Sequence, residues 1–409
     1  MSHVSHLRCV ECGREYRPTE VRYTCPACGI TGILDVLYDY DAAKKELNHM
    51  SLAANKERSH WRYLPLLPLT GRQFIQNLQV GWTPVYKANR VEAELGLKHL
   101  YIKDDGRNPT ASFKDRASSL SVSKALESGA KAIACASTGN AASSCAGFAA
   151  AAGLPCYIFV PKFAPEGKIA QLLMFGAKVM VVDGDYEATF RLSQQAIEHW
   201  GWYNRNAAIN PIPVEGKKTC GLEIAEQFQG NPPDYVFMSV GDGCSIAGTY
   251  KGLKEMHLLG LSQHVPKMIG VQAAGAQPLK LAWERNQPWR PTGADTFADS
   301  IAVGVPRNPT KALNAIRESG GRFVAVSDEE IASAMRLLPR LSGVFAEPAA
   351  AAAFAGLIQC VNSGIVRSTD RCLVVVTGNG LKDSASAIRV AGAPKLIPPD
   401  LDAVRAVVE

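Results

Sequence analysis

The chain has 409 residues and a formal net charge of +6, and 47% of its residues are hydrophobic while 20% are charged. This length exceeds what one hydrophobic core normally serves, so we expect two principal domains and a small module. No apolar run reaches about 18 residues, which excludes a helix that spans a bilayer. The mild, scattered positive charge argues against a dedicated nucleic-acid surface.

The N-terminal residues MSHVSHLRCVECGREY lack the basic segment, apolar segment and small-residue cleavage site of a secretory leader. We therefore expect a cytoplasmic protein with neither a membrane partner nor a nucleic-acid partner. Seven of the eleven cysteines stand singly in apolar or glycine-rich surroundings. We interpret these seven as reduced, mostly buried side chains.

The other four cysteines form two CxxC pairs, Cys9 with Cys12 and Cys25 with Cys28, separated by twelve residues and each followed by glycine. Such tight turns let four thiolates close a tetrahedron around Zn²⁺, which stabilises a segment too short to have its own core. The spacing predicts a structural zinc ribbon over residues 1–36. A redox pair, or a ribbon that has lost its metal, is the alternative. Four sulfur ligands leave no open position, which disfavours a catalytic zinc.

After a polar, helix-like stretch that runs into prolines, the chain alternates short β-branched runs with helical segments. Strands that alternate with helices predict parallel sheets buried on both faces, and hence a doubly wound α/β fold. We predict eight such strands, within residues 99–106, 131–140, 155–162, 178–185, 234–243, 267–275, 323–328 and 372–380.

Small-residue loops follow four of these predicted strands. Ligands of doubly wound sheets bind at the carboxyl ends of the strands, so these loops are candidates for a binding site. They are ASTGNAAS (136–143), SVGDGCSIAG (239–248), VQAAGAQ (271–277) and VTGNG (376–380).

Lys114 stands in the first turn of a helix that we predict to begin near Ser112. The positive end of the helix dipole disfavours an ammonium there and favours a neutral amine, which can attack a carbonyl. Most lysines at such positions are solvated surface residues, so the position of Lys114 alone does not establish catalysis.

The glycine loop that begins at Val240 precedes a predicted helix, and its backbone N–H groups suit a phosphate at the helix N-terminus. It lacks the ending of a nucleotide P-loop and the spacing of a dinucleotide fingerprint, and ordinary turn glycines are the alternative. Thr377 follows the last predicted strand and offers a hydroxyl to a ligand across the sheet edge. A hydroxyl that only caps the following turn is the simpler interpretation.

Five motifs, taken together and in order, resemble the fold-type II pyridoxal-phosphate enzymes, and among them the threonine synthase family. The motifs are NPTASFKDR, ASTGNAAS, VGDGCSIAG, GVFAEPAAAAAFAGL and TGNGLKD. The resemblance extends from about Gly81 to Asp383, and a four-cysteine ribbon ahead of the body also occurs in relatives. It implies pyridoxal 5′-phosphate as the cofactor, beside the structural Zn²⁺ of the ribbon, a small amino-acid substrate and a homodimer.

The resemblance also implies roles for individual residues. Lys114 is expected to hold the cofactor covalently and to act as the catalytic base, Asn140 to hydrogen-bond the ring hydroxyl, and Thr377 to face the pyridine nitrogen. The expected cofactor-binding residues are Lys114, Phe113, Asn140, Gly241, Asp242, Gly243, Cys244, Ser245 and Thr377. The expected substrate-binding residues are Ser137, Thr138 and Gly139, which would take the substrate carboxylate, with Lys168 and Arg205.

The fold implied by the resemblance has two doubly wound parallel-sheet domains behind the zinc ribbon. The larger domain, which would bind the cofactor, is expected to comprise residues 37–130 and 216–409. The smaller domain, on the substrate side, is expected to comprise residues 131–215.

The implied reaction converts O-phosphohomoserine and water to L-threonine and phosphate by γ-elimination and β-addition. The chain departs from the family's motifs where phosphate binding is concerned. Ala141 replaces a threonine, Pro213 stands where an arginine is common, and Asp242 and Ser245 replace asparagines. A charge-assisted hydrogen bond is typically worth ~1.5–3 kcal/mol, so these changes bear on the choice of substrate.

Cations elsewhere in the same segments are expected to compensate. Arg205, Lys168 and the pair Lys217–Lys218 lie in parts of the sequence that border the site in the family. Solvated surface positions are the alternative for each of them.

Two other functions stay open. An ammonia-lyase acting on threonine or serine, or another β- or γ-replacement enzyme, needs the same lysine and cofactor but no pocket for a substrate phosphate. A catalytically silent relative that uses the ribbon to bind a protein or a nucleic acid is the second alternative.

Overall fold

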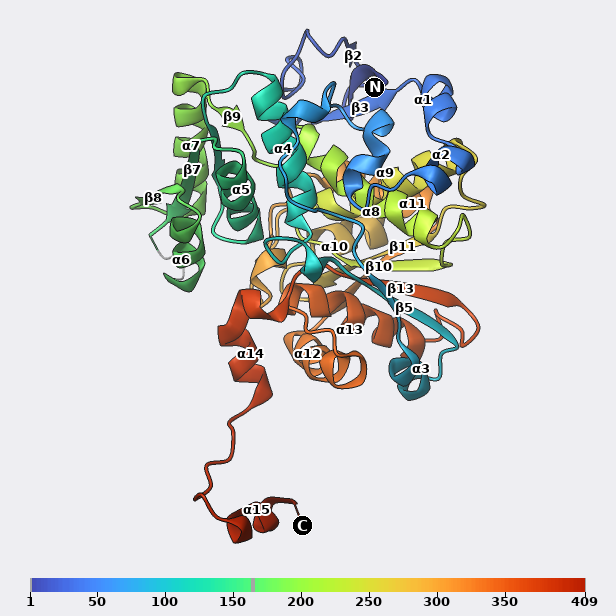
Figure 1. Ribbon diagram of the computed structural model, residues 1–409, viewed down its shortest axis with the longest axis vertical. Helices are drawn as coiled ribbons and strands as arrows, with labels where there is room; N and C mark the ends of the chain where they lie inside the picture. Colours follow the sequence, from blue (N-terminus) through green and yellow to red (C-terminus); the bar gives the residue numbers. More distant parts are fainter. Residues whose placement is uncertain (1, 163–165, 409) are drawn as a thin grey trace.

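The computed structural model describes residues 2–162 and 166–408, except for the side chains of residues 166–168. Three sheets organise this part of the chain, one in an N-terminal module and two in the body (Figure 1). No helix within the described ranges is long and apolar enough to cross a membrane.

The N-terminal sheet is antiparallel and has the strand order β2-β1-β3. Its strands are β1 (Val4–Cys9), β2 (Glu15–Tyr16) and β3 (Leu34–Tyr38). Gly13 and Gly29 follow the two CxxC pairs with φ of 73° and 63°, values that glycine adopts without steric conflict. Leu7, Leu34 and Val36 are buried in one core with helices of the body, so the module is packed firmly against the body.

The largest sheet has six strands in the order β12-β11-β10-β13-β5-β4. Five of them are parallel, and β4 joins the edge antiparallel to β5. The bounds are β4 (Val85–Lys87), β5 (His99–Asp104), β10 (Tyr235–Ser239), β11 (Lys267–Ala273), β12 (Arg322–Val326) and β13 (Arg371–Val376). The central strands are buried almost throughout, as expected of a parallel sheet covered on both faces.

The third sheet has four parallel strands in the order β8-β7-β6-β9. The bounds are β6 (Ile133–Ala136), β7 (Cys156–Pro161), β8 (Lys178–Val182) and β9 (Tyr203–Asn204). This sheet and its helices α5, α6 and α7 form the side of the molecule that is green in Figure 1.

The α-helices of the described residues fall into three groups. Those ahead of the sheets are α1 (Tyr40–Glu46) and α2 (His49–Ala54). Those up to the end of the four-stranded sheet are α3 (Asn89–Leu95), α4 (Lys114–Glu127), α5 (Asn140–Ala151), α6 (Glu166–Met174) and α7 (Tyr186–Trp200). The remainder are α8 (Ile212–Gln227), α9 (Cys244–Leu258), α10 (Pro278–Arg285), α11 (Pro309–Glu318), α12 (Asp328–Ser342), α13 (Pro348–Asn362), α14 (Ser384–Ala391) and α15 (Leu401–Val408).

Helix α8 packs against α4 on one side and α9 on the other, and glycines make both contacts close. A Cβ at Gly216 would lie 2.1 Å from the Arg116 carbonyl oxygen, and one at Gly252 would lie 2.0 Å from the Lys218 carbonyl oxygen. Because no other residue fits at these distances, the glycines fix how near the three helices lie. Helices α4 and α9 begin at the predicted lysine and at the predicted glycine loop.

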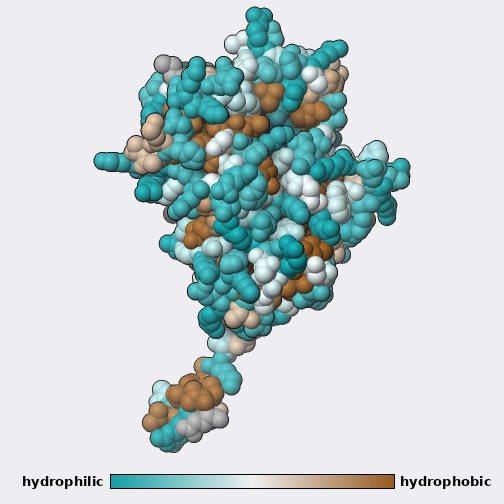
Figure 2. All heavy atoms as spheres, turned by 90° about the vertical axis from the view of Figure 1, so that its right-hand side faces the viewer, coloured by the Kyte–Doolittle hydropathy of each residue, from teal (hydrophilic) through white to brown (hydrophobic). Residues whose placement is uncertain are grey.

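The C-terminal part of the chain leaves the body after α14. Helix α15 lies apart from the rest of the molecule (Figure 1), and its surface is largely apolar (Figure 2). Leu401, Val404 and Val408 are exposed there, and Leu396 in the connecting segment is fully exposed.

The structure confirms the doubly wound α/β class and all eight predicted strands. β4 and β9 were not predicted because two or three residues are too few to show a pattern. The helix with the predicted lysine begins at Lys114 instead of near Ser112, since Ser112 pairs with Gly378 in an isolated bridge.

Candidate cofactor site

Lys114 is the first residue of α4, and the backbone before it is tied to the end of β13. The Phe113 N–H donates to the Thr377 carbonyl oxygen at 2.8 Å. Ala111 has a φ of 63°, a left-handed conformation that is unfavourable for a residue with a side chain. The surrounding contacts hold this loop in place, and they bring Lys114 and Thr377 to one cavity.

The pKa of the Lys114 amine lies below its usual value. Burial is the largest cause; the Glu347 carboxylate opposes it, and the Arg205 guanidinium reinforces it. The position at the N-terminus of α4 favours the neutral amine as well. A lowered pKa leaves more neutral amine near pH 7, which is the form that attacks a carbonyl.

Most of the predicted site residues line two adjoining cavities, which share Ser300, Glu347 and Ala349. We name the first the lysine cavity; of the predicted residues it contains Lys114, Ser137, Arg205, Gly241, Asp242, Gly243, Cys244, Ser245 and Thr377. We name the second the loop cavity; it contains Thr138, Gly139 and Asn140. Three of the four predicted loops therefore meet at the carboxyl ends of β6, β10 and β13.

Two predicted features, Phe113 and the loop at 271–277, lie away from these cavities. Phe113 is buried in the main hydrophobic core and is not a lining residue of either cavity. The loop at 271–277 is also not part of their lining, and a Cβ at Gly275 would lie 1.7 Å from the Asp295 carbonyl oxygen. That loop is thus packed against another segment. The side chain of Lys168 lies outside the described residues.

The glycine loop ends at Gly243, which is the N-cap of α9 with a φ of 88° and no side-chain cap. The helix starts at Cys244, so its first N–H groups face the lysine cavity without a protein acceptor at the cap. The Asp242 carboxylate accepts the Arg307 N–H at 3.1 Å, which occupies one of its oxygens. An uncapped helix N-terminus in a cavity fits a phosphate group, and these residues therefore fit pyridoxal phosphate.

Two hydroxyls stand at the ends of neighbouring strands in the lysine cavity. The Oγ atoms of Ser239, from β10, and Thr377, after β13, are 3.4 Å apart. Both are neutral groups, and the Thr377 hydroxyl is the one expected to face the pyridine nitrogen. Ser239 was not predicted, although it directly precedes the glycine loop.

Asn140 begins α5, and its side chain is bound to a carboxylate. Its Nδ2 donates to both Glu347 oxygens, at 2.9 and 3.0 Å. Glu347 is 5% exposed and directly precedes Pro348 at the start of α13. The sequence reasoning missed Glu347. A signal existed, because Glu347 is an isolated acid between a hydrophobic segment and an alanine-rich helix.

The lysine cavity contains two buried cations. Lys217 and Arg205 are each 2% exposed and line the lysine cavity. Arg205 donates from Nε and Nη2 to Ser118 Oγ at 3.1 and 3.0 Å. Within the described residues, neither forms an ion pair with a carboxylate. Burial lowers the pKa of Lys217 to about 8.

Lys218, the neighbour of Lys217, has a different environment. Its Nζ lies 2.7 Å from Glu215 Oε2 and 2.8 Å from Glu255 Oε2. This lysine is already paired inside the protein, which removes it as a candidate for binding a substrate anion.

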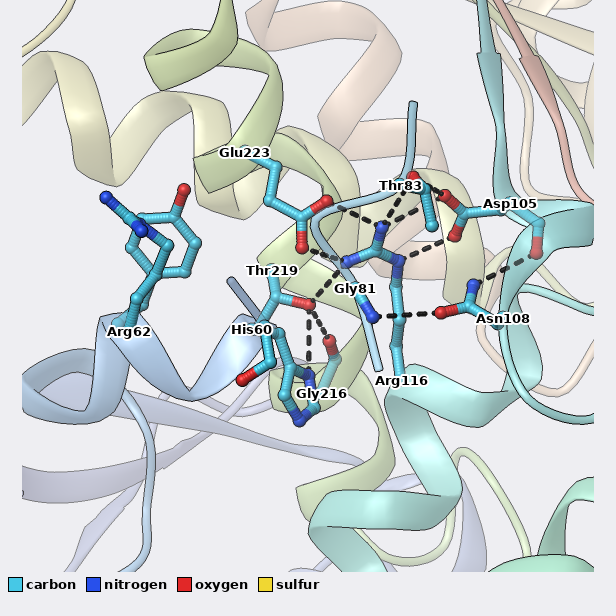
Figure 3. Close-up of polar contacts among 12 residues, drawn as sticks. His60, Arg62, Gly81, Thr83, Asp105, Asn108, Arg116, Gly216, Thr219 and Glu223 are labelled. Carbon is cyan, nitrogen blue, oxygen red and sulfur yellow. Dashed lines mark hydrogen bonds and ion pairs between the residues drawn. The ribbon is translucent and has the colours of Figure 1, made fainter. Parts of the chain in front are cut away.

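Arg116 fixes α4 to the elements around it (Figure 3). Its guanidinium lies between Asp105, with Nε to Oδ2 at 2.6 Å, and Glu223, with Nη1 to Oε1 at 2.6 Å. The Glu223 carboxylate also pairs with Lys103 at 2.9 Å. All four side chains are fully buried. The network therefore holds the start of α4, two residues from Lys114, against α8 and β5.

The four N-terminal cysteines come together as predicted. The Sγ atoms of Cys9, Cys12, Cys25 and Cys28 lie within 4.8 Å of one another. A Cβ at Gly32 would lie 2.7 Å from the Cβ atoms of Cys25 and Cys28, so the turn requires glycine. Sulfur atoms at this spacing fit one tetrahedral Zn²⁺.

Residues 77–378 match the family of pyridoxal-phosphate dependent enzymes. The chain therefore belongs to this family, as the lysine at the helix start and the uncapped phosphate loop suggest. Within this family, the curated relatives of the chain are threonine synthases. The chain is 40% identical over 403 residues to a threonine synthase of Methanosarcina acetivorans, with 98% of each chain covered. It is 39% identical over 407 residues to a threonine synthase of Methanocaldococcus jannaschii, with 98% of this chain and 99% of the relative covered.

Solved structures show the same fold at lower identity. A threonine deaminase isoform from Solanum lycopersicum has a TM-score of 0.66 and 23% identity, covering 76% of this chain and 82% of its own. A diaminopropionate ammonia lyase from Escherichia coli has a TM-score of 0.67 and 21% identity, covering 78% and 88%. These structures support the fold alone.

Proposed function

We propose that this chain is a threonine synthase, a lyase that converts O-phosphohomoserine and water to L-threonine and phosphate with pyridoxal 5′-phosphate as its cofactor. Identity of about 40% to curated threonine synthases over nearly the whole chain supports the reaction. From the structure, the observation that carries the proposal is the pair of buried cations, Lys217 and Arg205, in the lysine cavity.

Two buried cations that form no ion pair with a carboxylate in the described part of the chain favour an anionic ligand, because an uncompensated buried charge is unfavourable. The cofactor brings one phosphate, for which the uncapped N-terminus of α9 is suited. A substrate with its own phosphate would supply the second dianion. The arginine that is missing at Pro213 would thus be replaced by side chains from α8 and from the segment after β9.

Each residue would then have a defined task. The Lys114 amine would bind the cofactor and move the proton at the substrate Cα. Ser137, Thr138 and Gly139, at the N-terminus of α5, would bind the substrate carboxylate. Pyridoxal phosphate, when bound, supplies a sink for the electron pair left at carbon. Thr377 would face the pyridine nitrogen with a neutral hydroxyl, which moderates that sink. The residues that would hold the cofactor are Lys114, Asn140, Gly241, Asp242, Gly243, Cys244, Ser245 and Thr377, with Phe113 supporting from the core.

A side-by-side assay tests the proposal. O-phosphohomoserine is offered with threonine and free phosphate as readouts, and L-threonine and L-serine are offered with 2-oxo acids as readouts. We expect threonine and phosphate in equal amounts from the first substrate. Rapid 2-oxo acid formation without phosphate release would instead identify an ammonia-lyase. The Lys114→Ala variant controls for contaminating activity.

The ribbon and the domain division are further parts of the proposal. We infer that Cys9, Cys12, Cys25 and Cys28 bind one structural Zn²⁺, supported by their mutual spacing. We also infer the division into residues 1–36, residues 37–130 with 216–409, and residues 131–215, for which the three separate sheets are the support. Metal analysis of the purified protein and limited proteolysis test these two points.

A homodimer and a cytoplasmic location complete the proposal. The unpacked apolar residues of α15 support a subunit contact, since an isolated helix of this length is marginal in water. The seven cysteines of the body, all unpaired and buried, suit a reducing compartment. Light scattering coupled to size exclusion gives the subunit number.

A further inference from the structure

Glu347 is the acidic residue that lines both the lysine cavity and the loop cavity within the described part of the chain. It precedes Pro348 at the start of α13, and its N–H donates to the Gly378 carbonyl oxygen at 3.1 Å. This places the carboxylate where the segment after β13 meets the start of α5. No role follows for it from the residues already assigned.

The backbone around Glu347 makes room for its carboxylate. A Cβ at Gly378 would lie 2.3 Å from Glu347 Oε1, so any larger residue would displace it. A buried carboxylate is unfavourable unless it is paired and hydrogen-bonded. The fold therefore keeps an energetically unfavourable carboxylate beside the segment that contains Thr377 and Gly378.

The Asn140 amide is one partner of this carboxylate. Its Nδ2 donates to both Glu347 oxygens, at 2.9 and 3.0 Å. An asparagine side chain has two N–H donors and one carbonyl acceptor. The contact with Glu347 fixes the orientation of the amide, with Nδ2 toward the carboxylate. The remaining polar atoms of the amide are then left for a ligand in the cavity.

The charge of Glu347 also stands against the cations of the site. Lys114, Arg205 and Lys217 line the lysine cavity. The other acid of the described residues that lines the lysine cavity, Asp242, accepts the backbone N–H of Arg307. The electrostatic influence of Glu347 on Lys114 is second only to burial and opposes it.

We propose that Glu347 is a positioning residue of the cofactor site: its carboxylate holds the Asn140 amide in one orientation and keeps a negative charge opposite the Lys114 amine. The inference rests on the proposed function only in that Lys114 binds the cofactor. It does not depend on which amino acid is the substrate.

The charge is tested in the apoprotein, without any substrate. The rate at which pyridoxal 5′-phosphate is captured is followed by absorbance across pH, and its profile reports the pKa of the Lys114 amine. In Glu347→Gln, which keeps the shape, we expect this pKa to fall by about one unit, a tenfold change in proton affinity. Glu347→Asp and the exposed Glu329→Gln should keep the parent profile. An unchanged profile in Glu347→Gln overturns this role.

The orientation is tested with pyridoxine 5′-phosphate, which lacks the aldehyde and binds without reacting with lysine. We expect Glu347→Gln and Asn140→Ala each to weaken its binding about tenfold, and the double variant to lose no more than either alone. Additive losses would show that the two residues act separately. Gly378→Ala, which pushes the intact carboxylate aside, should reproduce the Glu347→Gln result and guards against a folding artefact. If both tests failed, the role of Glu347 would be wrong, while the conclusion from the threonine synthase assay would still stand.

Discussion

Lys217 and Lys218 are neighbours in α8 and have opposite environments. Successive residues of a helix point about 100° apart. One side chain therefore reaches the lysine cavity, and the other reaches Glu215 and Glu255. The buried, unpaired state of Lys217 makes it the residue whose charge matters most for an anionic ligand.

Replacing Lys217 by methionine should weaken binding of the phosphorylated substrate. A charge-assisted hydrogen bond is worth about 1.5–3 kcal/mol, so KM for O-phosphohomoserine should rise by roughly 10- to 100-fold. Steady-state kinetics measures this. Lys162→Met, on the surface and paired with Asp183, is the matched control. An unchanged KM in Lys217→Met would place the substrate phosphate elsewhere.

The same lysine should make anion binding depend on pH. Burial lowers the pKa of Lys217 to about 8, so the ammonium form predominates below pH 8 and is lost above it. The affinity of the apoprotein for inorganic phosphate should therefore fall as pH rises through 8 to 9. Isothermal titration calorimetry gives this profile. It should become flat in Lys217→Met; a parallel fall in both proteins would point to a different group.

At the scale of elements, sequence and structure agree where a residue stands at a strand or helix end. Lys114 and Thr377 could be located because the carboxyl ends of parallel strands face the ligand. Glu347 could not, since its importance depends on Asn140, 207 residues away in sequence. The choice between Lys217 and Lys218 likewise required the rotation of α8, which its apolar pattern does not reveal because the helix is buried nearly all round.

The close contact of α8 and α9 predicts a sensitive glycine. In Gly252→Ala the new methyl group would lie 2.0 Å from the Lys218 carbonyl oxygen, and the helices must separate. Overpacking of this kind costs about 1–3 kcal/mol. Urea unfolding measures the loss. Gly293→Ala, where the nearest atom is 3.8 Å from the new Cβ, should leave the unfolding free energy unchanged, and equal stability of both variants would contradict the account.

The Arg116 network predicts acid sensitivity. The Arg116→Met variant leaves the buried Asp105 and Glu223 carboxylates without the guanidinium between them. This should lower the free energy of unfolding by about 3–5 kcal/mol. Burial alone would raise the pKa of Glu223, but Arg116 and Lys103 hold it at about 2. A lowered carboxyl pKa stabilises the fold above about pH 4.5 and loses that contribution as pH falls toward 2. Chemical unfolding between pH 7 and 3 should show the parent losing stability and the variant losing less.

At the scale of the whole molecule, the ribbon is part of the body's core. Leu7, Cys25 and Val36 share one hydrophobic cluster with Leu253 of α9. The sequence predicted the ribbon from its cysteine spacing, but it could not show this packing, because the contacting residues are far apart in the chain. Loss of the ribbon should therefore destabilise the body of the protein as well as the first forty residues.

Removing a proposed zinc ligand in Cys25→Ser should lower the melting temperature of the full chain, because three cysteines would bind Zn²⁺ less tightly than four. Mass spectrometry of metal content and differential scanning calorimetry measure the two effects together. Cys360→Ser, in the core of the body far from the ribbon, controls for loss of a buried thiol. A normal zinc content in Cys25→Ser would refute the ligand assignment.

Asp35 of β3 joins the ribbon to two helices, at 3.0 Å from Lys251 Nζ of α9 and 3.1 Å from Lys311 Nζ of α11. Burial works against this charge, but the two lysines hold the pKa of Asp35 below its usual range. Helix α9 begins directly after the glycine loop, so these ion pairs connect the N-terminal module to the helix at whose start the cofactor phosphate would bind. A disturbance of the N-terminal module should therefore weaken cofactor binding in the body.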